Sequence, residues 1–338
     1  MKIGIIHHEN NAKDKIREVL HHKTDHDVIW GTNYGLHALE LCENQRPDLI
    51  LLDVYVMEYD GIQFISELVT EVKCPVLLVT DSLEKSSYWV FEAMSHGAID
   101  VAVYNGEESA PLIQKVQQMA LLVSPKPIAA SPKIRGPSPQ NRSRHNPLIL
   151  FGASTGGPLA LASILSSFPQ DLNASVVIVQ HVDEKFSSGL SDWLSDRTLL
   201  PVELVREETR PVPGKIYLSD SKWHLVMTSS QTLSYSSKSD SNVYRPSVDV
   251  LFESVAQNWK IPSTAVLLTG MGADGAVGLK KLKDKGWITI AEAESSCVVF
   301  GMPKAAIEMK AATEVLDLHQ IPLAVLSHLR RIHQKVAS

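Results

Sequence analysis

A serine between two glycines offers the clearest chemistry in this sequence. Gly152, Ser154 and Gly156 fit the pattern G-x-S-x-G, which exposes a serine hydroxyl on a tight turn between a strand and a helix. The apolar residues 148–151 predict a buried strand that ends just before Gly152, and Gly-Pro at 157–158 predicts the start of the helix. Such a hydroxyl can attack a carbonyl carbon while N–H groups at the helix start stabilise the oxyanion. The same pattern also fits a glycine-rich helix cap without chemistry.

Two further strand ends offer groups that would activate this hydroxyl. The apolar run 176–179 is followed after one residue by His181, and the run 265–268 leads into a glycine-rich turn that contains Asp274. An imidazole can take a proton near neutral pH, and a carboxylate can fix its tautomer. Because parallel strands end at one edge of a sheet, we predict that Ser154, His181 and Asp274 meet there as a catalytic triad.

Chain order separates this triad from more common ones. The order Ser-His-Asp differs from the order Ser-Asp-His of α/β-hydrolases. An ordinary α/β-hydrolase would need Asp249 or Asp274 as the acid and His319 or His333 as the base, and both histidines are near the terminal helix. A dinucleotide site is also disfavoured, because residues 153–158 do not give G-x-G-x-x-G.

The first 120 residues alternate short apolar runs with amphipathic stretches. This alternation predicts a parallel sheet with helices on both faces. The expected strands are 3–6, 28–30, 49–52, 76–79 and 99–103, and the expected helices are 12–22, 35–44, 61–71, 84–96 and 110–121. Functional groups gather at the carboxyl ends of such strands, where Asp53 and Thr80 stand.

Residues 1–120 resemble a two-component receiver domain. The resemblance rests on Arg-Pro-Asp-Leu-Ile-Leu-Leu-Asp at 46–53, Asp-Gly at 60–61, Leu-Leu-Val-Thr at 77–80 and Met-Ser-His-Gly-Ala-Ile-Asp at 94–100. It implies that Asp53 is the phosphoacceptor and that Thr80 is the hydroxyl that senses the phosphoryl group. A receiver also implies a histidine kinase as partner.

The metal-binding positions of this receiver depart from the family. The acidic pair that holds Mg²⁺ is replaced by His7 and His8, with Glu9 one residue further on. Mg²⁺ prefers oxygen ligands, so two imidazoles are poor substitutes. Six histidines fall within the first 37 residues, at 7, 8, 21, 22, 26 and 37, and their spacing matches no compact ligand motif. We therefore expect exposed helix and loop histidines rather than a confident metal site.

Other receiver positions depart as well. Tyr104 replaces the lysine expected after the fifth strand, Asn105 replaces the usual proline, and Met57 stands where a proline is common. Phosphoryl transfer depends on cations that neutralise the phosphoryl charge. The sequence therefore leaves open whether Asp53 is phosphorylated with Mg²⁺, and it is compatible with a degenerate receiver.

Composition divides the chain into domains. Residues 1–120 carry 19 Asp and Glu against 9 Lys and Arg, whereas 124–147 carry five basic residues, six prolines and no acid. This change predicts a Pro-rich basic linker at 122–146, between the receiver-like (βα)5 domain at 1–121 and a second α/β domain at 147–338.

The second domain resembles the catalytic domain of CheB-type protein-glutamate methylesterases over about residues 146–338. Five motifs carry the resemblance: Gly-Ala-Ser-Thr-Gly-Gly at 152–157, Gln-His at 180–181, Arg-Pro-Ser-Val-Asp at 245–249, Thr-Gly-Met-Gly-Ala-Asp-Gly at 269–275 and Ser-Cys-Val-Val-Phe-Gly-Met-Pro at 296–303. The resemblance implies a doubly wound α/β fold for this domain. It also implies hydrolysis of γ-glutamyl methyl esters on the cytoplasmic helices of chemoreceptors, deamidation of particular glutamines, and gating by the receiver. It assigns Ser154 as nucleophile, His181 as base and Asp274 as orienting acid. It places Thr155 and Met271 beside the reacting carbonyl, and it requires no cofactor for catalysis.

Two features of this domain need a separate interpretation. Residues 182–184 are Val-Asp-Glu where the family usually has Met-Pro-Pro, and we interpret the two acids as solvated loop residues. Cys297 has no base next to it in the sequence, so we interpret it as a small packed hydrophobic residue and not as a nucleophile.

The whole chain has the composition of a globular protein. Of its 338 residues, 44% are hydrophobic and 21% are charged, no run is long enough to span a membrane, and no signal peptide is evident. Three scattered cysteines favour a reducing cytoplasm, and a net charge of −6 argues against nucleic-acid binding. Two alternatives stay open: a non-enzymatic docking module, and a hydrolase of small-molecule esters.

Overall fold

The chain folds into two compact units, Met1–Pro127 and Ile128–Ser338. The computed structural model describes residues 1–56, 62–120, 147–220, 222–236 and 245–337. The predicted linker at 122–146 lies outside the described residues, so the domain boundaries stay a prediction. Within the described residues, every helix is too short or too polar to cross a membrane.

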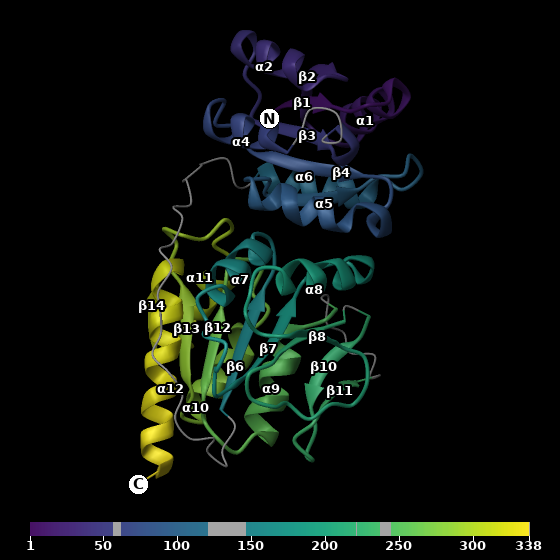
Figure 1. The fold of residues 1–338 in the computed structure, drawn as a ribbon. Coiled ribbons are helices and arrows are strands. Elements are labelled where there is room, and N and C mark those ends of the chain that lie inside the picture. The colour runs from purple at the N-terminus through teal and green to yellow at the C-terminus, as the bar shows by residue number, and fades with distance from the viewer. Residues whose placement is uncertain (57–61, 121–146, 221, 237–244, 338) are drawn as a thin grey trace. The chain divides into compact units, whose positions relative to one another are not determined.

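The first unit contains a five-stranded parallel sheet in the order β2-β1-β3-β4-β5 (Figure 1). Its strands are β1 (Lys2–Ile6), β2 (Asp27–Thr32), β3 (Leu49–Asp53), β4 (Val76–Thr80) and β5 (Asp100–Val103). Its helices are α1 (Asn10–Lys23), α2 (Gly35–Asn44), the 3-10 helix η1 (Val54–Val56), α4 (Gln63–Thr70), α5 (Leu83–Ser95) and α6 (Ala110–Ala120). The predicted alternation of strand and helix is confirmed.

Both faces of this sheet are covered. One core cluster joins alternate side chains of four strands, including Ile5 and Leu51, to Ile16 of α1 and Val116 of α6. The other strand residues face α2, α4 and α5, from which Leu68 and other apolar side chains are buried. Burial on both faces explains why the strands are continuous apolar runs.

The second unit contains a seven-stranded parallel sheet in the order β14-β13-β12-β6-β7-β9-β8. Its strands are β6 (Leu148–Ala153), β7 (Ser175–Gln180), β8 (Val202–Val205), β9 (Ile216–Ser219), β12 (Thr264–Leu267), β13 (Ile288–Glu292) and β14 (Glu314–Leu316), and β10 (His224–Met227) and β11 (Leu233–Ser236) form a separate antiparallel pair. Its helices are α7 (Gly157–Leu165), η2 (Glu184–Phe186), α8 (Ser187–Ser195), α9 (Val248–Asn258), α10 (Ala276–Asp284), α11 (Met302–Glu308), η3 (Leu318–Gln320) and α12 (Ile321–Ala337).

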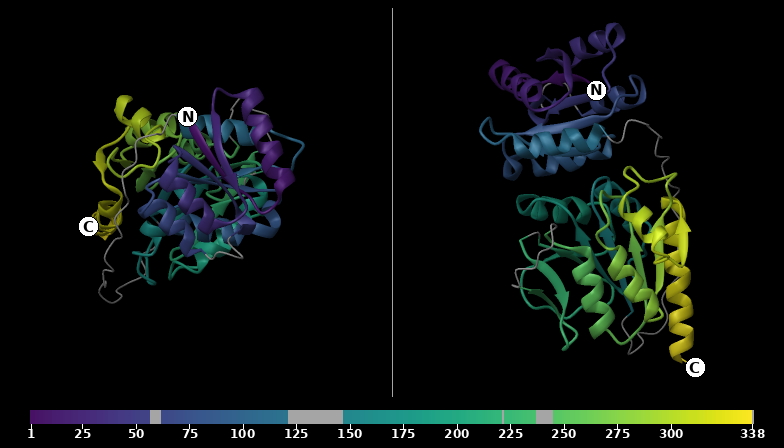
Figure 2. Two further views of the ribbon diagram at one scale, coloured as in Figure 1. Left: turned by 90° about the horizontal axis from the view of Figure 1, so that it is seen from above. Right: turned by 180° about the vertical axis from the view of Figure 1, so that it is seen from behind.

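The helices of this unit also cover both faces of its sheet. Side chains of α9, α10 and α11 share one core cluster with Leu150, Val177 and Leu267 of the central strands. On the other face, the ring of Phe151 lies 6.4 Å from that of Phe168, just beyond α7. The opposed views of Figures 1 and 2 show α12 running beside the β13–β14 edge. The central strands β6, β7 and β12 are therefore fully buried, and only their ends can meet a substrate.

The strand order reverses beside β6. The chain passes from β6 to its neighbour β7 and later returns to β12 on the other side of β6. Ala153 pairs with Gln180, and Gly152 pairs with Leu267, so the three strands end at nearly the same level. A reversal of this kind opens a crevice at the carboxyl ends of the strands, which is where ligands bind in open α/β sheets.

The predicted end of β6 is wrong by two residues. The strand continues through Gly152 to Ala153, and the left-handed residue of the turn is Gly156, with a φ of 79°. Gly152 is required for another reason, because a Cβ there would lie 2.3 Å from Cγ1 of Val248. It lets α9 pack closely against the sheet instead of forming the corner.

Candidate active site

Ser154 follows β6 and is half-buried on a short turn. Its N–H donates to the carbonyl of Thr269 (3.0 Å), and its own carbonyl accepts from the N–H of Gly157 (2.8 Å). A Cβ on Gly270 would lie 2.7 Å from the Cβ of Ser154, so only glycine lets the β12 turn approach so closely. The turn that carries the serine is thus fixed against the neighbouring strand end.

His181 stands at the matching position on the next strand, directly after β7. Its N–H donates to the carbonyl of Ala153 (2.9 Å). The buried amide of Gln180 donates to the carbonyl of Ser154 (2.8 Å) and to that of His181 (3.0 Å). Gln180 therefore ties the serine turn to the histidine, a positioning role that sequence reasoning missed although the residue was part of a quoted motif.

A hydrogen bond joins the histidine to the predicted acid. Nε2 of His181 lies 2.8 Å from Oδ2 of Asp274. An ionised carboxylate can only accept, so Nε2 carries the hydrogen and Nδ1 keeps the lone pair of the neutral ring. A base for a nearby hydroxyl needs this tautomer.

The carboxylate of Asp274 is held by the N-terminus of α9. It accepts from the N–H of Val248 (2.7 Å), the N–H of Asp249 (3.1 Å) and the hydroxyl of Ser247 (2.8 Å). Burial opposes its ionisation, but the hydrogen bonds from His181 and from the helix start outweigh burial and lower the pKa of Asp274 below its usual value. The acid is therefore ionised at neutral pH and fixed in orientation.

The residues of the α/β-hydrolase alternative do not come together. The carboxylate of Asp249 accepts the N–H of Gly278 (2.6 Å), and burial raises its pKa to about 6. Nε2 of His333 lies 3.1 Å from the side-chain amide of Asn173, and His319 lies in η3. The structure thus favours the pairing of His181 with Asp274.

Thr155 follows the serine in the chain, and Met271 lies in the glycine-rich turn after β12. Thr155 is buried, and its carbonyl accepts the hydroxyl of Thr269 (3.0 Å). Met271 is half-buried and follows Gly270, whose carbonyl accepts from N–H groups at the start of α11. Their backbone amides are the candidates for an oxyanion site.

A buried carboxyl at the end of β13 supports this arrangement. Glu292 accepts the N–H of Thr269 (2.8 Å) and the hydroxyl of Ser296 (3.0 Å), and burial raises its pKa. Its position at a fourth strand end was a signal that sequence reasoning overlooked. Nearby, burial raises the pKa of Cys297, whose thiol stays protonated, in agreement with the interpretation that it is not a nucleophile.

The two acids after His181 are exposed, as expected. Oδ1 of Asp183 accepts the N–H of Lys185 (3.0 Å) and caps η2. Glu184 pairs with Lys222 at 3.7 Å, an exposed ion pair.

The first unit has a second group of polar residues at its strand ends. Asp53 ends β3 and is 2% exposed, at one side of a cavity of about 320 Å³. The lining residues are His7, His8, Glu9, Asn11, Ala12, Lys15, Asp53, Tyr55, Asp81, Tyr104, Asn105 and Gly106. Oδ1 of Asp53 accepts the N–H of Tyr55 (3.1 Å), and Oδ2 accepts the N–H of His8 (3.2 Å). The predicted phosphoacceptor is therefore buried but borders an open pocket.

The expectation of exposed histidines is confirmed for His21, His22 and His37 but is wrong for His7 and His26, which are only partly exposed. The imidazole of His7 is 12% exposed, and its Nδ1 lies 3.4 Å from Oδ2 of Asp53. Burial lowers the pKa of His7, although the charge of Asp53 opposes this effect. His8 is more exposed, but its Nδ1 contacts the same carboxylate oxygen. The spacing of the histidines could not predict this contact, because the carboxylate that His7 and His8 approach lies on another strand.

The remaining receiver positions divide into two sets. Tyr104 and Asn105 line the cavity of Asp53, and so does Lys15 of α1, a cation that sequence reasoning missed. Thr80 ends β4 on the neighbouring strand, where its hydroxyl donates to the carbonyl of Ser82 (3.1 Å). Met57 and the Asp-Gly pair at 60–61 lie outside the described residues.

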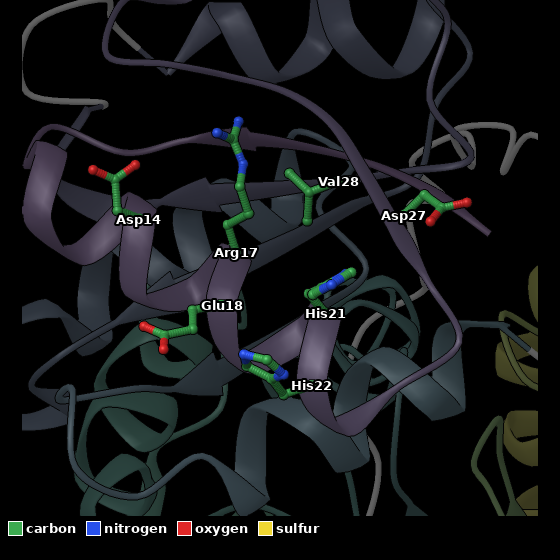
Figure 3. A pocket seen from close by; sticks show the side chains of 7 residues that line it. All are labelled: Asp14, Arg17, Glu18, His21, His22, Asp27 and Val28. Atoms are coloured by element: carbon green, nitrogen blue, oxygen red, sulfur yellow. The ribbon is translucent and has the colours of Figure 1, made fainter.

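Another cavity, of about 420 Å³, lies over α1 and the start of β2 (Figure 3). It is lined by Asp14, Arg17, Glu18, His21, His22, Asp27 and Val28. Figure 3 shows five of these side chains spread along α1, with Asp27 and Val28 on the neighbouring strand, and they do not point at one centre. Their mixed charges are typical of a solvated surface, so we assign this cavity no function.

Comparisons with known proteins agree with both parts of this description. A family model described as CheB methylesterase matches residues 149–325, and one described as response regulator receiver domain matches residues 3–104. A protein-glutamate methylesterase/protein-glutamine glutaminase of Pseudomonas aeruginosa is 38% identical over 328 residues, covering 95% of this chain and 97% of that protein. One from Mesorhizobium japonicum is 39% identical over 341 residues, covering 98% of this chain and 99% of that protein. The crystal structure of the Thermotoga maritima CheB methylesterase catalytic domain matches with a TM-score of 0.52 and 33% identity, covering 54% of this chain and 98% of that one. The chain therefore belongs to the CheB methylesterase family and carries an N-terminal response-regulator receiver domain.

Proposed function

We propose that this enzyme hydrolyses γ-glutamyl methyl esters on the cytoplasmic helices of chemoreceptors, and that it also deamidates particular glutamines there. The observation that carries the chemistry is the 2.8 Å hydrogen bond from His181 to Asp274, formed beside the turn that presents Ser154. The names of the relatives, protein-glutamate methylesterase/protein-glutamine glutaminase, support the substrate class.

The proposed reaction is acyl transfer through Ser154. Its hydroxyl oxygen attacks the ester carbonyl while Nδ1 of His181 takes the proton. The N–H groups of Thr155 and Met271 stabilise the oxyanion, and methanol leaves with the proton from His181. Water, activated by the same nitrogen, then attacks the acyl-enzyme and releases the receptor glutamate. Every proton in this sequence moves through one imidazole, so the chemistry requires no cofactor.

Asp274 acts in this mechanism by fixing the tautomer of His181. The carboxylate keeps the hydrogen of His181 on Nε2 and stabilises the imidazolium that forms in each step. The helix start that holds Asp274 stabilises this buried negative charge.

The receiver supplies regulation in this proposal. Asp53 accepts a phosphoryl group from a chemotaxis-type histidine kinase, and Thr80 senses it, which would gate the esterase in the cytoplasm. We propose the domains as 1–121, 122–146 and 147–338. The relatives cover nearly the whole chain, which supports a receiver acting together with the esterase.

Replacing the nucleophile tests the proposal. Purified full-length protein is added to membranes that carry methylated chemoreceptors, and released methanol is measured with and without a small phosphodonor. Ser154→Ala should lower the rate by about 10³-fold or more, whereas Ser166→Ala, which changes an exposed serine at the end of α7, should leave it unchanged.

Three outcomes would contradict the proposal. Unchanged methanol release with Ser154→Ala would exclude this serine as nucleophile. No release from any methylated receptor would favour a docking module. A faster reaction with small-molecule methyl esters than with receptors would favour the alternative hydrolase.

A further inference from the structure

Three side chains in the cavity of Asp53 form a group that the proposed esterase chemistry does not use. One nitrogen of His7, one of His8 and one oxygen of Asp53 all lie within 4.8 Å of one another. Among the described residues, this is the one group of three or more His, Cys, Asp or Glu side chains with such spacing. It comes from two adjacent strand ends, since His7 and His8 follow β1 and Asp53 ends β3.

We propose that His7, His8 and Asp53 bind a divalent transition-metal ion of the zinc class, at the place where a receiver would hold Mg²⁺. Imidazole nitrogen is a good ligand for Zn²⁺, Cu²⁺ and Ni²⁺, whereas Mg²⁺ takes an octahedral shell of oxygens and dehydrates reluctantly. Two nitrogens and one carboxylate therefore select against Mg²⁺ and for the zinc class.

The separation of His7 from Asp53 fits such an ion. In a tetrahedral zinc site with bonds of about 2.0–2.1 Å, ligand atoms lie about 3.3 Å apart. Nδ1 of His7 lies 3.4 Å from Oδ2 of Asp53. Nδ1 of His8 contacts the same oxygen more closely than two ligands of one ion lie, so this ring has to move back when an ion binds. An ionised carboxylate and the lone pair of an imidazole repel each other, so a proton or a cation has to stand between them. One metal ion would remove this repulsion for both imidazoles.

Neighbouring groups show which ring nitrogens carry a lone pair. Nδ1 of His7 accepts the N–H of Glu9 (3.1 Å), so it carries a lone pair, and an ion that binds there has to displace this N–H. The carboxylate of Glu9 lies 3.6 Å from Nε2 of His8, where it would take the hydrogen of a ring bound through Nδ1. The two rings are nearly parallel, with centroids 5.1 Å apart and an angle of 16°.

The rest of the cavity leaves room for a further ligand. Its volume of about 320 Å³ admits water or a phosphoryl oxygen as the fourth ligand of a three-residue site. Lys15 and Asp81 line the same cavity and bring one charge of each sign. The site is thus open on one side, as a site that exchanges a ligand needs to be.

A competition titration of the full-length protein tests this site. The metal-free chain is titrated with Zn²⁺ against a chromophoric chelator, and Co²⁺ absorption reports the coordination. We expect one ion per chain at this site, unaffected by millimolar Mg²⁺. His7→Asn and His8→Asn should each weaken binding by at least about tenfold. The matched control is His21→Asn with His22→Asn, which removes an adjacent exposed histidine pair from α1 and should change nothing.

Several results would overturn the inference. These are the absence of a bound ion, displacement of Zn²⁺ by Mg²⁺, unchanged affinity in the His7 and His8 variants, or an equal loss in the control. Far-ultraviolet circular dichroism of each variant separates a lost ligand from a lost fold. The titration uses no ester substrate, so its outcome is independent of the proposed hydrolysis.

Discussion

Replacing Asp274 by Asn tests how the structure fixes the tautomer of the base. Both carboxylate oxygens accept hydrogen bonds: Oδ2 from His181 and the N–H of Val248, and Oδ1 from the hydroxyl of Ser247 and the N–H of Asp249. An Asn side chain has one oxygen and one NH2 group. Whichever way the amide turns, its NH2 group faces hydrogen-bond donors, either His181 and Val248 or Ser247 and Asp249.

Either orientation lowers the rate. If the NH2 group faces His181, Nε2 must accept, the hydrogen moves to Nδ1 and the ring can no longer take the proton of Ser154. A wrong tautomer of this kind costs about 10⁴ in kcat. If the oxygen faces His181, the tautomer is kept, but a neutral amide stabilises the imidazolium less. Losing a hydrogen bond to a charged group is worth about 2 kcal/mol, or about 30-fold. We therefore expect kcat to fall between about 30-fold and about 10⁴-fold.

Methanol release from methylated chemoreceptors measures this loss, and thermal unfolding of each variant shows that the fold is kept. The matched control is Asp249→Asn, a carboxylate in the first turn of the same helix whose side chain bonds Gly278 and not the histidine. This control should keep the wild-type rate within about threefold. If Asp274→Asn also stays within about threefold of wild type, or if both variants lose equally, the assigned role of Asp274 is wrong.

Three further changes test the surroundings of the triad. Ser247→Ala removes both the N-cap of α9 and a hydrogen bond to the triad carboxylate. The free energy of unfolding should therefore fall by about 2–3 kcal/mol, and kcat should fall as well. The control Ser254→Ala on the same helix should lower the free energy of unfolding by about 1 kcal/mol and leave kcat unchanged. Burial raises the pKa of Asp249 from 3.8 to about 6, so the folded protein favours the protonated carboxyl. The free energy of unfolding that this preference contributes is fully present below about pH 4 and is lost as the pH rises through 6. Asp249→Asn, which can still accept the N–H of Gly278, should therefore stabilise the protein by on the order of 1 kcal/mol at pH 8 and hardly at pH 4, as measured by urea unfolding; an equal gain at both values would contradict this. Cys297→Ala should keep full activity, and a loss of turnover in a folded variant would contradict its assignment as a packed thiol.

Much of the second unit could be predicted because its signals are local. Apolar runs of four residues mark the central strands, and the residue just after a run is placed at the sheet edge by the strand itself. This rule alone placed Ser154 and His181 side by side, as the pairing of Ala153 with Gln180 shows. On β12 the rule places only the start of the turn at this edge, because Asp274 lies several residues beyond the end of the strand.

The sequence could not show what holds these groups. The N-terminus of α9 binds Asp274 across 26 residues of chain, and only the packing of α9 on the sheet brings them together. The sequence predicts that the strand ends before Gly152 because glycine favours turns, whereas the role of Gly152 is to make room for Val248. The group of His7 and His8 also includes Asp53, which is 45 residues from His8 in the sequence. No periodic pattern in a sequence indicates a contact over such a separation.

The most direct test of Ser154 as the nucleophile is to trap it. Full-length protein is treated with a fluorophosphonate, which phosphonylates activated serines, and the modified peptide is located by mass spectrometry. One adduct on Ser154 is expected, and it should be lost in His181→Ala, because the hydroxyl is activated only by that imidazole. Labelling at another residue with loss of esterase activity, or labelling of Ser154 that persists at the wild-type rate in His181→Ala, would contradict the mechanism.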